Sequence, residues 1–251
     1  MKLLIAAALG VLALPVQAQQ GTVTIQVQTF QTGLGDVKIT PIYHACLLIE
    51  GGGKVIYVDP AKPASFTGLP KADLILITHE HADHVDQDLT SIKAISKGDT
   101  QLWAPVAVTK FVTTASVISN GQTKQFGEWT IEAIPAYNLQ RGPAAGRYYH
   151  PKGNGNGYVL SYGGKRFYIS GDTENVPEIR ALKNIDVAFI CINLPYTITV
   201  DEAADAVKAF HPKIVFPYHY RANPPTNLQA FKQKLAGTGI EVRLLDWYPP
   251  L

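Results

Sequence analysis

Three histidines and an aspartate lie within six residues of one another, in the stretch Thr78-His79-Glu80-His81-Ala82-Asp83-His84. The apolar run Ala72–Ile77 that precedes them has strand character. In an extended segment, side chains two apart project to the same side, so His79 and His81 can share a metal ion. Asp83 and His84, after a turn, can reach a second ion nearby. Because no thiolate belongs to the cluster, its chemistry favours zinc first, with iron or manganese as alternatives.

Two later motifs, Gly171-Asp172-Thr173 and Pro217-Tyr218-His219-Tyr220, complete a resemblance to the metallo-β-lactamase superfamily, whose signature is similar to His79-x-His81-x-Asp83-His84. The resemblance implies a four-layer αβ/βα sandwich, an α/β fold, with a site for two divalent metal ions at one edge of its two sheets. It also implies that Asp59 does not bind a metal ion itself and orients one of the ligand histidines. The implied ligands are His79 and His81 for metal one, Asp83, His84 and His219 for metal two, and Asp172 as a bridge between them.

The third protein ligand of metal one departs from the commonest family pattern, because Asn138 stands where many members carry a histidine. The segment Ala136-Tyr137-Asn138, followed by His150-Pro151-Lys152-Gly153, resembles a lactonase-like or phospholipase-D-like branch. We therefore predict His150 at or near metal one; the alternative is an exposed loop histidine, which leaves metal one with fewer ligands. His44 is either a residue lining the site or a hydrogen-bonded strand histidine, and His211 is assigned to a helix end.

The chain alternates between runs of strands and mixed strand–helix segments, and this order occurs twice, which predicts two sheets covered by outer helices. Glycine runs at Gly51-Gly52-Gly53 and Gly163-Gly164 predict turns between antiparallel strands. Polar, glycine-rich sequence over 135–157 predicts a long surface loop. The expected helices are 85–95, 109–118, 201–210 and 228–235, and the expected later strands are 186–190, 213–216 and 242–245.

The first 18 residues, a basic start followed by an apolar core and a Val-x-Ala end, predict a signal peptide cut after Ala18. We therefore expect a periplasmic or secreted protein with no membrane span after cleavage, and one domain over 19–251. The 251 residues carry a formal charge of +2, which gives no basic field for nucleic acid. Cys46 and Cys191 lie in apolar runs and are expected to be free, buried thiols.

The predicted function is hydrolysis of a small ester, lactone, amide or phosphodiester by metal-bound hydroxide, with Asp83 and Asp172 as catalytic residues. Arg141, Arg147 and Lys152 could meet an anionic substrate or form a solvated charge set. Three alternatives remain open: a secreted β-lactamase, which Asp172 opposes, a mononuclear iron oxygenase of sulfur compounds, and a non-enzymatic periplasmic metal- or ligand-binding protein. Nothing in the sequence specifies the oligomeric state.

Overall fold

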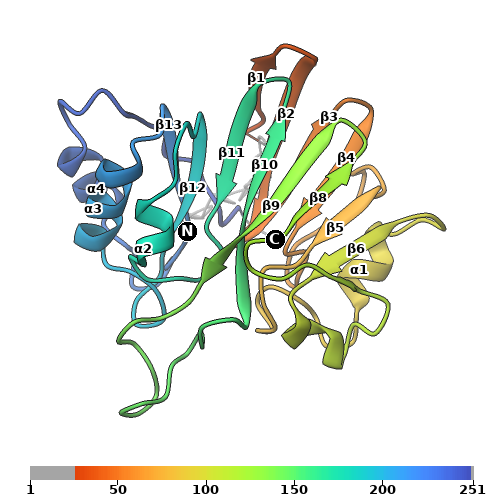
Figure 1. Ribbon diagram of the computed structural model, residues 1–251, viewed down its shortest axis with the longest axis horizontal. Helices are drawn as coiled ribbons and strands as arrows, with labels where there is room; N and C mark the ends of the chain where they lie inside the picture. The colour runs from red at the N-terminus through yellow and green to blue at the C-terminus, as the bar shows by residue number, and fades with distance from the viewer. Residues whose placement is uncertain (1–25, 250–251) are drawn as a thin grey trace, which may run out of the picture.

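The computed structural model describes residues 26–249, which form two seven-stranded sheets packed face to face (Figure 1). The predicted signal peptide, residues 1–18, lies outside the described residues. The first sheet has the strand order β1 (Gln28–Thr32), β2 (Gly35–Tyr43), β3 (Cys46–Gly51), β4 (Lys54–Val58), β5 (Leu74–Leu76), β6 (Gln101–Ala104) and β7 (Ser116–Val117). The second has the order β14 (Glu241–Val242), β13 (Ile214–Tyr220), β12 (Val187–Ile192), β11 (Lys165–Ile169), β10 (Gly155–Tyr162), β9 (Trp129–Ala136) and β8 (Thr123–Phe126).

Helices cover the outer faces of the two sheets, as Figure 1 shows. Helix α1 (Thr90–Ile95) lies on the side of the first sheet, together with the short 3₁₀ helix Val106–Lys110. Helices α2 (Pro177–Arg180), α3 (Val200–Phe210) and α4 (Leu228–Lys234) lie on the side of the second sheet. The layers confirm the predicted αβ/βα sandwich.

Each sheet repeats the same plan, as the sequence pattern predicts. Its first four strands along the chain pair antiparallel, and its fourth to seventh strands pair parallel. The two predicted glycine turns join β3 to β4 and β10 to β11. Gly51 ends β3, while Gly52, Gly53, Gly163 and Gly164 form the turns and adopt positive φ angles between 53° and 80°. That conformation suits a two-residue turn between antiparallel strands. Because parallel strands end at the same edge of a sheet, the residues that follow them lie together at one edge of the molecule.

Aromatic side chains fill the space between the sheets. Phe189 stacks on Phe216 with ring centroids 4.9 Å apart, and Trp129 stacks on Tyr162 at 4.6 Å. The Trp129 indole also donates a 3.1 Å hydrogen bond to the Gly51 carbonyl of the other sheet. Each large apolar side chain buried in this way contributes about 1.5–3 kcal/mol to folding, so the core supplies a rigid platform for the polar edge.

Four predicted elements differ from the structure. The closing strand expected over 242–245 is one of them, because β14 spans only Glu241–Val242. The helix expected over 85–95 begins only at Thr90, because the buried carboxylate of Asp86 accepts hydrogen bonds from the backbone N–H groups of Lys62 and Ser91 and holds the chain in turns. The helix expected over 109–118 is wrong. The 3₁₀ helix ends at Lys110 and β7 follows, in keeping with the low helix propensity of the β-branched pair Thr113-Thr114.

The loop expected over 135–157 is shorter, since β9 continues to Ala136 and β10 begins at Gly155. It projects away from the sheets at the lower left of Figure 1. It is also not wholly a surface loop: Tyr137, Asn138 and His150 are buried. Its two ends therefore belong to the interior of the protein.

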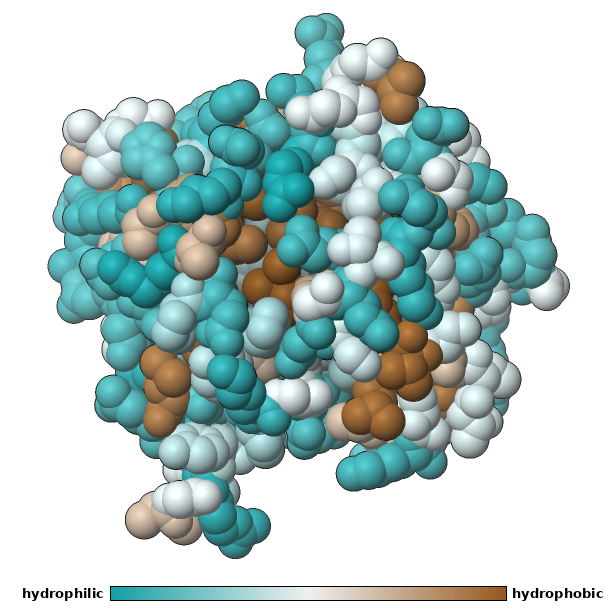
Figure 2. Space-filling model, in the orientation of Figure 1, coloured by the Kyte–Doolittle hydropathy of each residue, from teal (hydrophilic) through white to brown (hydrophobic). Residues whose placement is uncertain are grey.

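The surface in the view of Figure 2 is mainly hydrophilic, and hydrophobic side chains reach it in separate groups. Within residues 26–249, no helix has the length and apolar character needed to cross a membrane. Both cysteines are free and buried, as predicted.

Candidate metal centre

The predicted ligands gather where strands of both sheets end. His79 and His81 follow β5, Asp172 follows β11, and His219 lies near the end of β13. His150 reaches the same place from the loop between β9 and β10. Residues that lie 140 positions apart in the chain therefore share one edge of the sandwich.

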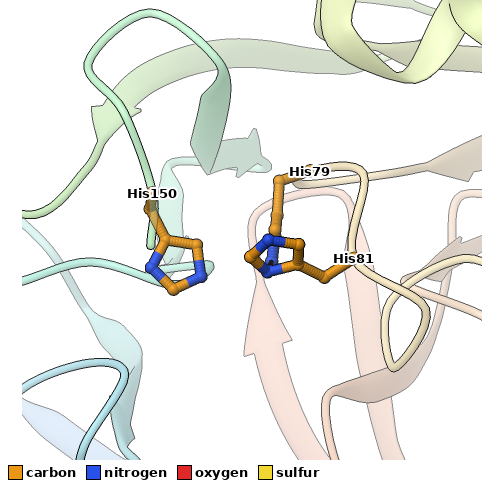
Figure 3. A group of neighbouring side chains, drawn as sticks. All are labelled: His79, His81 and His150. Atoms are coloured by element: carbon orange, nitrogen blue, oxygen red, sulfur yellow. Dashed lines mark hydrogen bonds between the residues drawn. The ribbon is translucent and has the colours of Figure 1, made fainter. Parts of the chain in front are cut away.

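Three imidazoles form the first group of candidate ligands, which we call site one. Nε2 of His79 lies 3.1 Å from Nδ1 of His81, and the His150 ring lies 4.9 Å, centroid to centroid, from each of the other two rings. Figure 3 shows His150 facing His79 and His81 from the opposite segment. One nitrogen of each residue lies within 4.8 Å of the others, so a single cation can bind all three.

Site two gathers four donor atoms whose spacings are close to those of a tetrahedral metal site. Nε2 of His84 lies 3.0 Å from Nε2 of His219. Oδ2 of Asp83 lies 3.8 and 3.4 Å from these two nitrogens, and Oδ1 of Asp172 lies 3.5 and 3.4 Å from them. A tetrahedron around zinc, with bonds near 2.1 Å, has edges of about 3.4 Å. The donor set therefore fits a cation of that size.

Asp172 stands between the two sites. Its Oδ2 atom lies 3.2 Å from Nε2 of His150 at site one, while Oδ1 faces the two imidazoles of site two. Nε2 of His150 and Oδ1 of Asp172 are buried and have no hydrogen-bond partner among the described residues. Buried polar atoms without partners are costly, and a bound cation would satisfy both.

Asp59 supports one imidazole at each site. Its wholly buried carboxylate accepts hydrogen bonds from His84 Nδ1 at 2.8 Å and from the Thr78 hydroxyl at 2.7 Å. The Thr78 oxygen in turn lies 3.0 Å from Nδ1 of His79 and can accept its proton. With a cation bound, both histidines would thus keep a proton on Nδ1 and present the lone pair of Nε2 to the centre. The structure places Asp59 where the resemblance implied, and it adds Thr78.

Burial and neighbouring charges shift the pKa values of the imidazoles in the centre in opposite directions. Burial lowers the pKa of His79 and of His81, and neighbouring imidazoles lower both further. Burial also lowers the pKa of His84. The carboxylates of Asp172, Asp59 and Asp83 outweigh burial and raise that pKa to about 10.

The two candidate carboxylate ligands stay ionised. Burial raises the pKa of each, but imidazoles outweigh it and hold both pKa values well below the usual range. For Asp83 the largest of these opposing effects is the charge of His84, and for Asp172 it is that of His219. Both carboxylates are therefore negative and available to a cation at neutral pH.

His44 lines the centre, which decides between the two readings that the sequence left open. It lies in the turn between β2 and β3, with Nε2 3.1 Å from Oδ2 of Asp83 and Nδ1 2.6 Å from the Tyr248 hydroxyl. The backbones of His44, Asp59 and His219 all have positive φ angles, of 54°, 49° and 44°. Such conformations cost about 1–3 kcal/mol each and concentrate at functional sites. His211 lies elsewhere, at the C-terminal end of α3, as expected.

Two of the three loop cations are already paired. Arg141 lies 2.8 Å from the Glu202 carboxylate and 3.4 Å from that of Glu174, and Lys152 lies 2.9 Å from Glu178. These ion pairs stabilise the loop and occupy the charges that a substrate would otherwise contact. Sequence reasoning did not single out Glu174, although it lies two residues after Asp172 and is buried; a buried carboxylate beside a ligand motif was the available signal.

Comparison with known proteins identifies the family of the chain. A family model described as a β-lactamase superfamily domain matches residues 38–219. The chain belongs to the metallo-β-lactamase superfamily. A UPF0173 metal-dependent hydrolase from Pyrococcus abyssi is 32% identical over 228 residues, covering 83% of this chain and 96% of that protein.

Solved structures give the same assignment. A crystal structure described as a metal-dependent hydrolase from Parabacteroides distasonis is 42% identical and has a TM-score of 0.81, covering 88% of this chain and 98% of that one. A metallo hydrolase from Ignicoccus hospitalis shares the fold with a TM-score of 0.70 at 24% identity, covering 84% and 95%. The protein is a metal-dependent hydrolase, and the non-enzymatic alternative is set aside.

Proposed function

We propose that the protein is a dinuclear hydrolase, with zinc as the resident metal, acting on a small ester, lactone, amide or phosphodiester. The observation that carries this proposal is the position of Asp172, whose two oxygens face two separate groups of imidazoles. Site one would use His79, His81 and His150, and site two Asp83, His84 and His219. Two bound cations would supply an activated water nucleophile near neutral pH and polarise the substrate oxygen.

The residues around the cations have separate tasks in this proposal. Asp172 holds the two sites at a fixed separation. The Asp83 side chain is 48% exposed and is tied on one side to His44, so its remaining lone pairs can accept a hydrogen bond from an attacking water. Its ionised state, set by the neighbouring imidazoles, suits it to orient that water rather than to supply a proton.

An open groove next to Tyr248 would receive a small substrate, and none of the residues that line it is a proposed metal ligand. It has a volume of about 420 Å³ and is bounded by Tyr248, whose hydroxyl contacts His44, and by Tyr220, Arg221 and Asp246. Such a volume is typical of small-molecule sites. Arg221 donates to the carbonyls of Leu194 and Asn223, and within residues 26–249 no carboxylate lies within ion-pair distance of it. We propose Arg221, rather than Arg141 or Lys152, as the cation available to an anionic substrate group.

We further propose that the chain acts outside the cytoplasm. The support is the basic start, apolar core and small-residue end of residues 1–18. N-terminal sequencing of the protein from the periplasm or the culture medium should find a chain that begins at Gln19. A chain that retains Met1 in the cytoplasmic fraction would contradict export.

The decisive experiment is a metal-reconstituted screen of lactones, phosphodiesters, thioesters and β-lactams, run beside Asp172→Asn. Wild type should bind two ions per chain and turn over at least one substrate class. The variant should lose hydrolysis by a factor of about 10² or more while remaining folded, because an amide cannot bridge two cations as a carboxylate does. Asp99→Asn, at a side chain that is 83% exposed, is the matched control and should behave as wild type.

Near wild-type rates for Asp172→Asn, or a single ion in fully loaded wild type, would contradict the dinuclear mechanism. Turnover of the β-lactam alone would instead identify a β-lactamase. Oxygen consumption by the iron-loaded protein would support the oxygenase alternative.

A further inference from the structure

Asn138, which stands where a third metal-one histidine was expected, is hydrogen-bonded to the histidine that replaces it. Oδ1 of Asn138 accepts hydrogen bonds from the backbone N–H of His150 at 2.7 Å and from His150 Nδ1 at 2.8 Å. The Asn138 backbone N–H donates to the His150 carbonyl at 2.8 Å. Both residues are at most 4% exposed, so water does not compete for these bonds.

The orientation of the Asn138 amide is fixed by its other partners. Nδ2 donates to Oε1 of Glu174 at 3.0 Å and to the Tyr196 carbonyl at 2.8 Å. Both of these partners are acceptors, and the backbone N–H of His150 is a donor, so only one placement of oxygen and nitrogen satisfies all of them. Nδ1 of His150 must then carry the proton, which leaves the lone pair on Nε2 facing site one.

Glu174 anchors this arrangement from the side away from the cations. Besides Asn138, its carboxylate accepts from the backbone N–H groups of Arg141 at 2.7 Å and Gln140 at 3.2 Å. The Arg141 guanidinium lies 3.4 Å from it and continues to Glu202 at the first turn of α3. Both oxygens of the buried carboxylate accept hydrogen bonds from donors. The NH₂ group of a neutral amide at position 174 would therefore face a donor in either orientation.

We propose that Asn138 is a positioning residue and that a Glu174–Asn138–His150 relay holds Nε2 of His150 on metal one. The relay takes the place of a third ligand supplied directly from position 138. It rests on the proposed function, in which His150 is a ligand. It makes the affinity of site one depend on Asn138 and Glu174, neither of which faces a cation. Site two does not use this relay and depends on Asp59, which also supports site one through Thr78.

The test measures the affinity of each site by chelator competition in the full chain, together with the bound protons of His150 by long-range ¹⁵N–¹H NMR of the metal-free protein. In Asn138→Ala, one of the two affinities should fall about 10- to 100-fold, the other should stay within twofold, and His150 should lose its Nδ1–H tautomer preference. Glu174→Gln should weaken the same site, because its NH₂ group must face either the donors that now bind Oε1, which are Asn138 Nδ2 and the Arg141 N–H, or the Gln140 N–H that binds Oε2.

Two further variants separate positioning from folding and from simple shape. Asn138→Asp keeps the shape but sets a carboxylate against Glu174 and the Tyr196 carbonyl, so it should not rescue site one. Glu178→Gln, which removes a carboxylate that contacts the same loop through Lys152, is the matched control and should leave both affinities unchanged. Thermal unfolding of the metal-free variants identifies any that fail to fold, and Glu174→Gln then carries the test.

Failure of the relay and failure of the proposed function give different results. If His150→Ala loses one ion while Asn138→Ala and Glu174→Gln keep both within twofold, the relay is wrong and the dinuclear centre stands. If His150→Ala keeps both ions at wild-type affinity, His150 is not a ligand and the proposed function fails at site one. Rescue of site one by Asn138→Asp would show that shape alone suffices and would also overturn the relay.

Discussion

Replacing Asp59 by asparagine should disable both metal sites through histidine tautomers, although Asp59 faces neither site. The change preserves shape, and asparagine tolerates the positive φ of 49° at this position, so the backbone should not move. The carboxylate accepts three hydrogen bonds, of 2.7 Å from the Thr78 N–H, 2.7 Å from its hydroxyl and 2.8 Å from His84 Nδ1. An amide can accept on one side only.

The Thr78 N–H can only donate, so the amide oxygen will face it and the NH₂ group will face His84 and the Thr78 hydroxyl. His84 must then accept on Nδ1, which moves its proton to Nε2, the atom that faces site two. The hydroxyl, now an acceptor, turns its own proton toward His79 Nδ1 and moves the proton of that ring toward site one. Loss of such a support typically costs 10- to 100-fold in metal affinity, and we expect about that at each site.

The assay is chelator competition with zinc, combined with NMR of the ring nitrogens of His79, whose lowered pKa keeps it neutral in the metal-free protein. Asp99→Asn again serves as the control for a change of one charge. Wild-type affinity at both sites, or Nδ1–H tautomers retained in the folded variant, would refute the tautomer argument. An unfolded variant is recognised by circular dichroism, and Thr78→Val, which removes only the hydroxyl, then tests the branch that leads to His79.

Two further predictions concern pH and the turn that carries Asp172. The pKa of His84 is raised to about 10, so its proton stabilises the metal-free protein fully below about pH 6.5, its ordinary pKa, and that contribution is lost as the pH rises toward 10. Zinc must displace the same proton, so apparent affinity should rise with pH over this interval and proton release should be measurable by calorimetry in buffers of different ionisation enthalpy; affinity independent of pH from 7 to 9 would contradict the shift. Gly171→Ala should destabilise the fold by about 1–3 kcal/mol in urea titrations and weaken metal binding, because a Cβ at φ 59° would lie 2.7 Å from the Asn156 carbonyl. Gly164→Ala, at φ 80° with nothing within 4 Å, is its control and should lose about 1 kcal/mol with metal binding unchanged; equal effects on metal binding would show that the crowding does not matter.

The metal centre concentrates backbone strain as well as charge. Three of the residues that form or support it, His44, Asp59 and His219, have left-handed backbones, at a cost of about 1–3 kcal/mol each. The sheets and their aromatic core hold these conformations in place before any cation arrives. The centre is therefore largely organised by the fold, and cation binding has little backbone rearrangement to complete.

Local spacing determined the first half of the centre. In His79-x-His81-x-Asp83-His84 the geometry follows from a strand end and one turn, and both depend on residues that are neighbours in the chain. Glycine runs in the same way predicted the two turns between antiparallel strands, because a two-residue turn has few conformations open to other residues. The repeated order of strands and helices predicted the sandwich, because each sheet must bury its apolar face against another layer.

Tertiary structure decided the rest, because it depends on partners that no local pattern connects. The helix after the cluster starts late, since the Asp86 carboxylate binds the backbone of Lys62, 24 residues earlier. His150 is buried and is not an exposed loop histidine. Its backbone N–H donates to Asn138, 12 residues earlier, and Asn138 in turn donates to Glu174, 24 residues after His150. The sequence by itself determined which side chains could bind metal. Only long-range hydrogen bonds to buried carboxylates decided which of their atoms face the two sites.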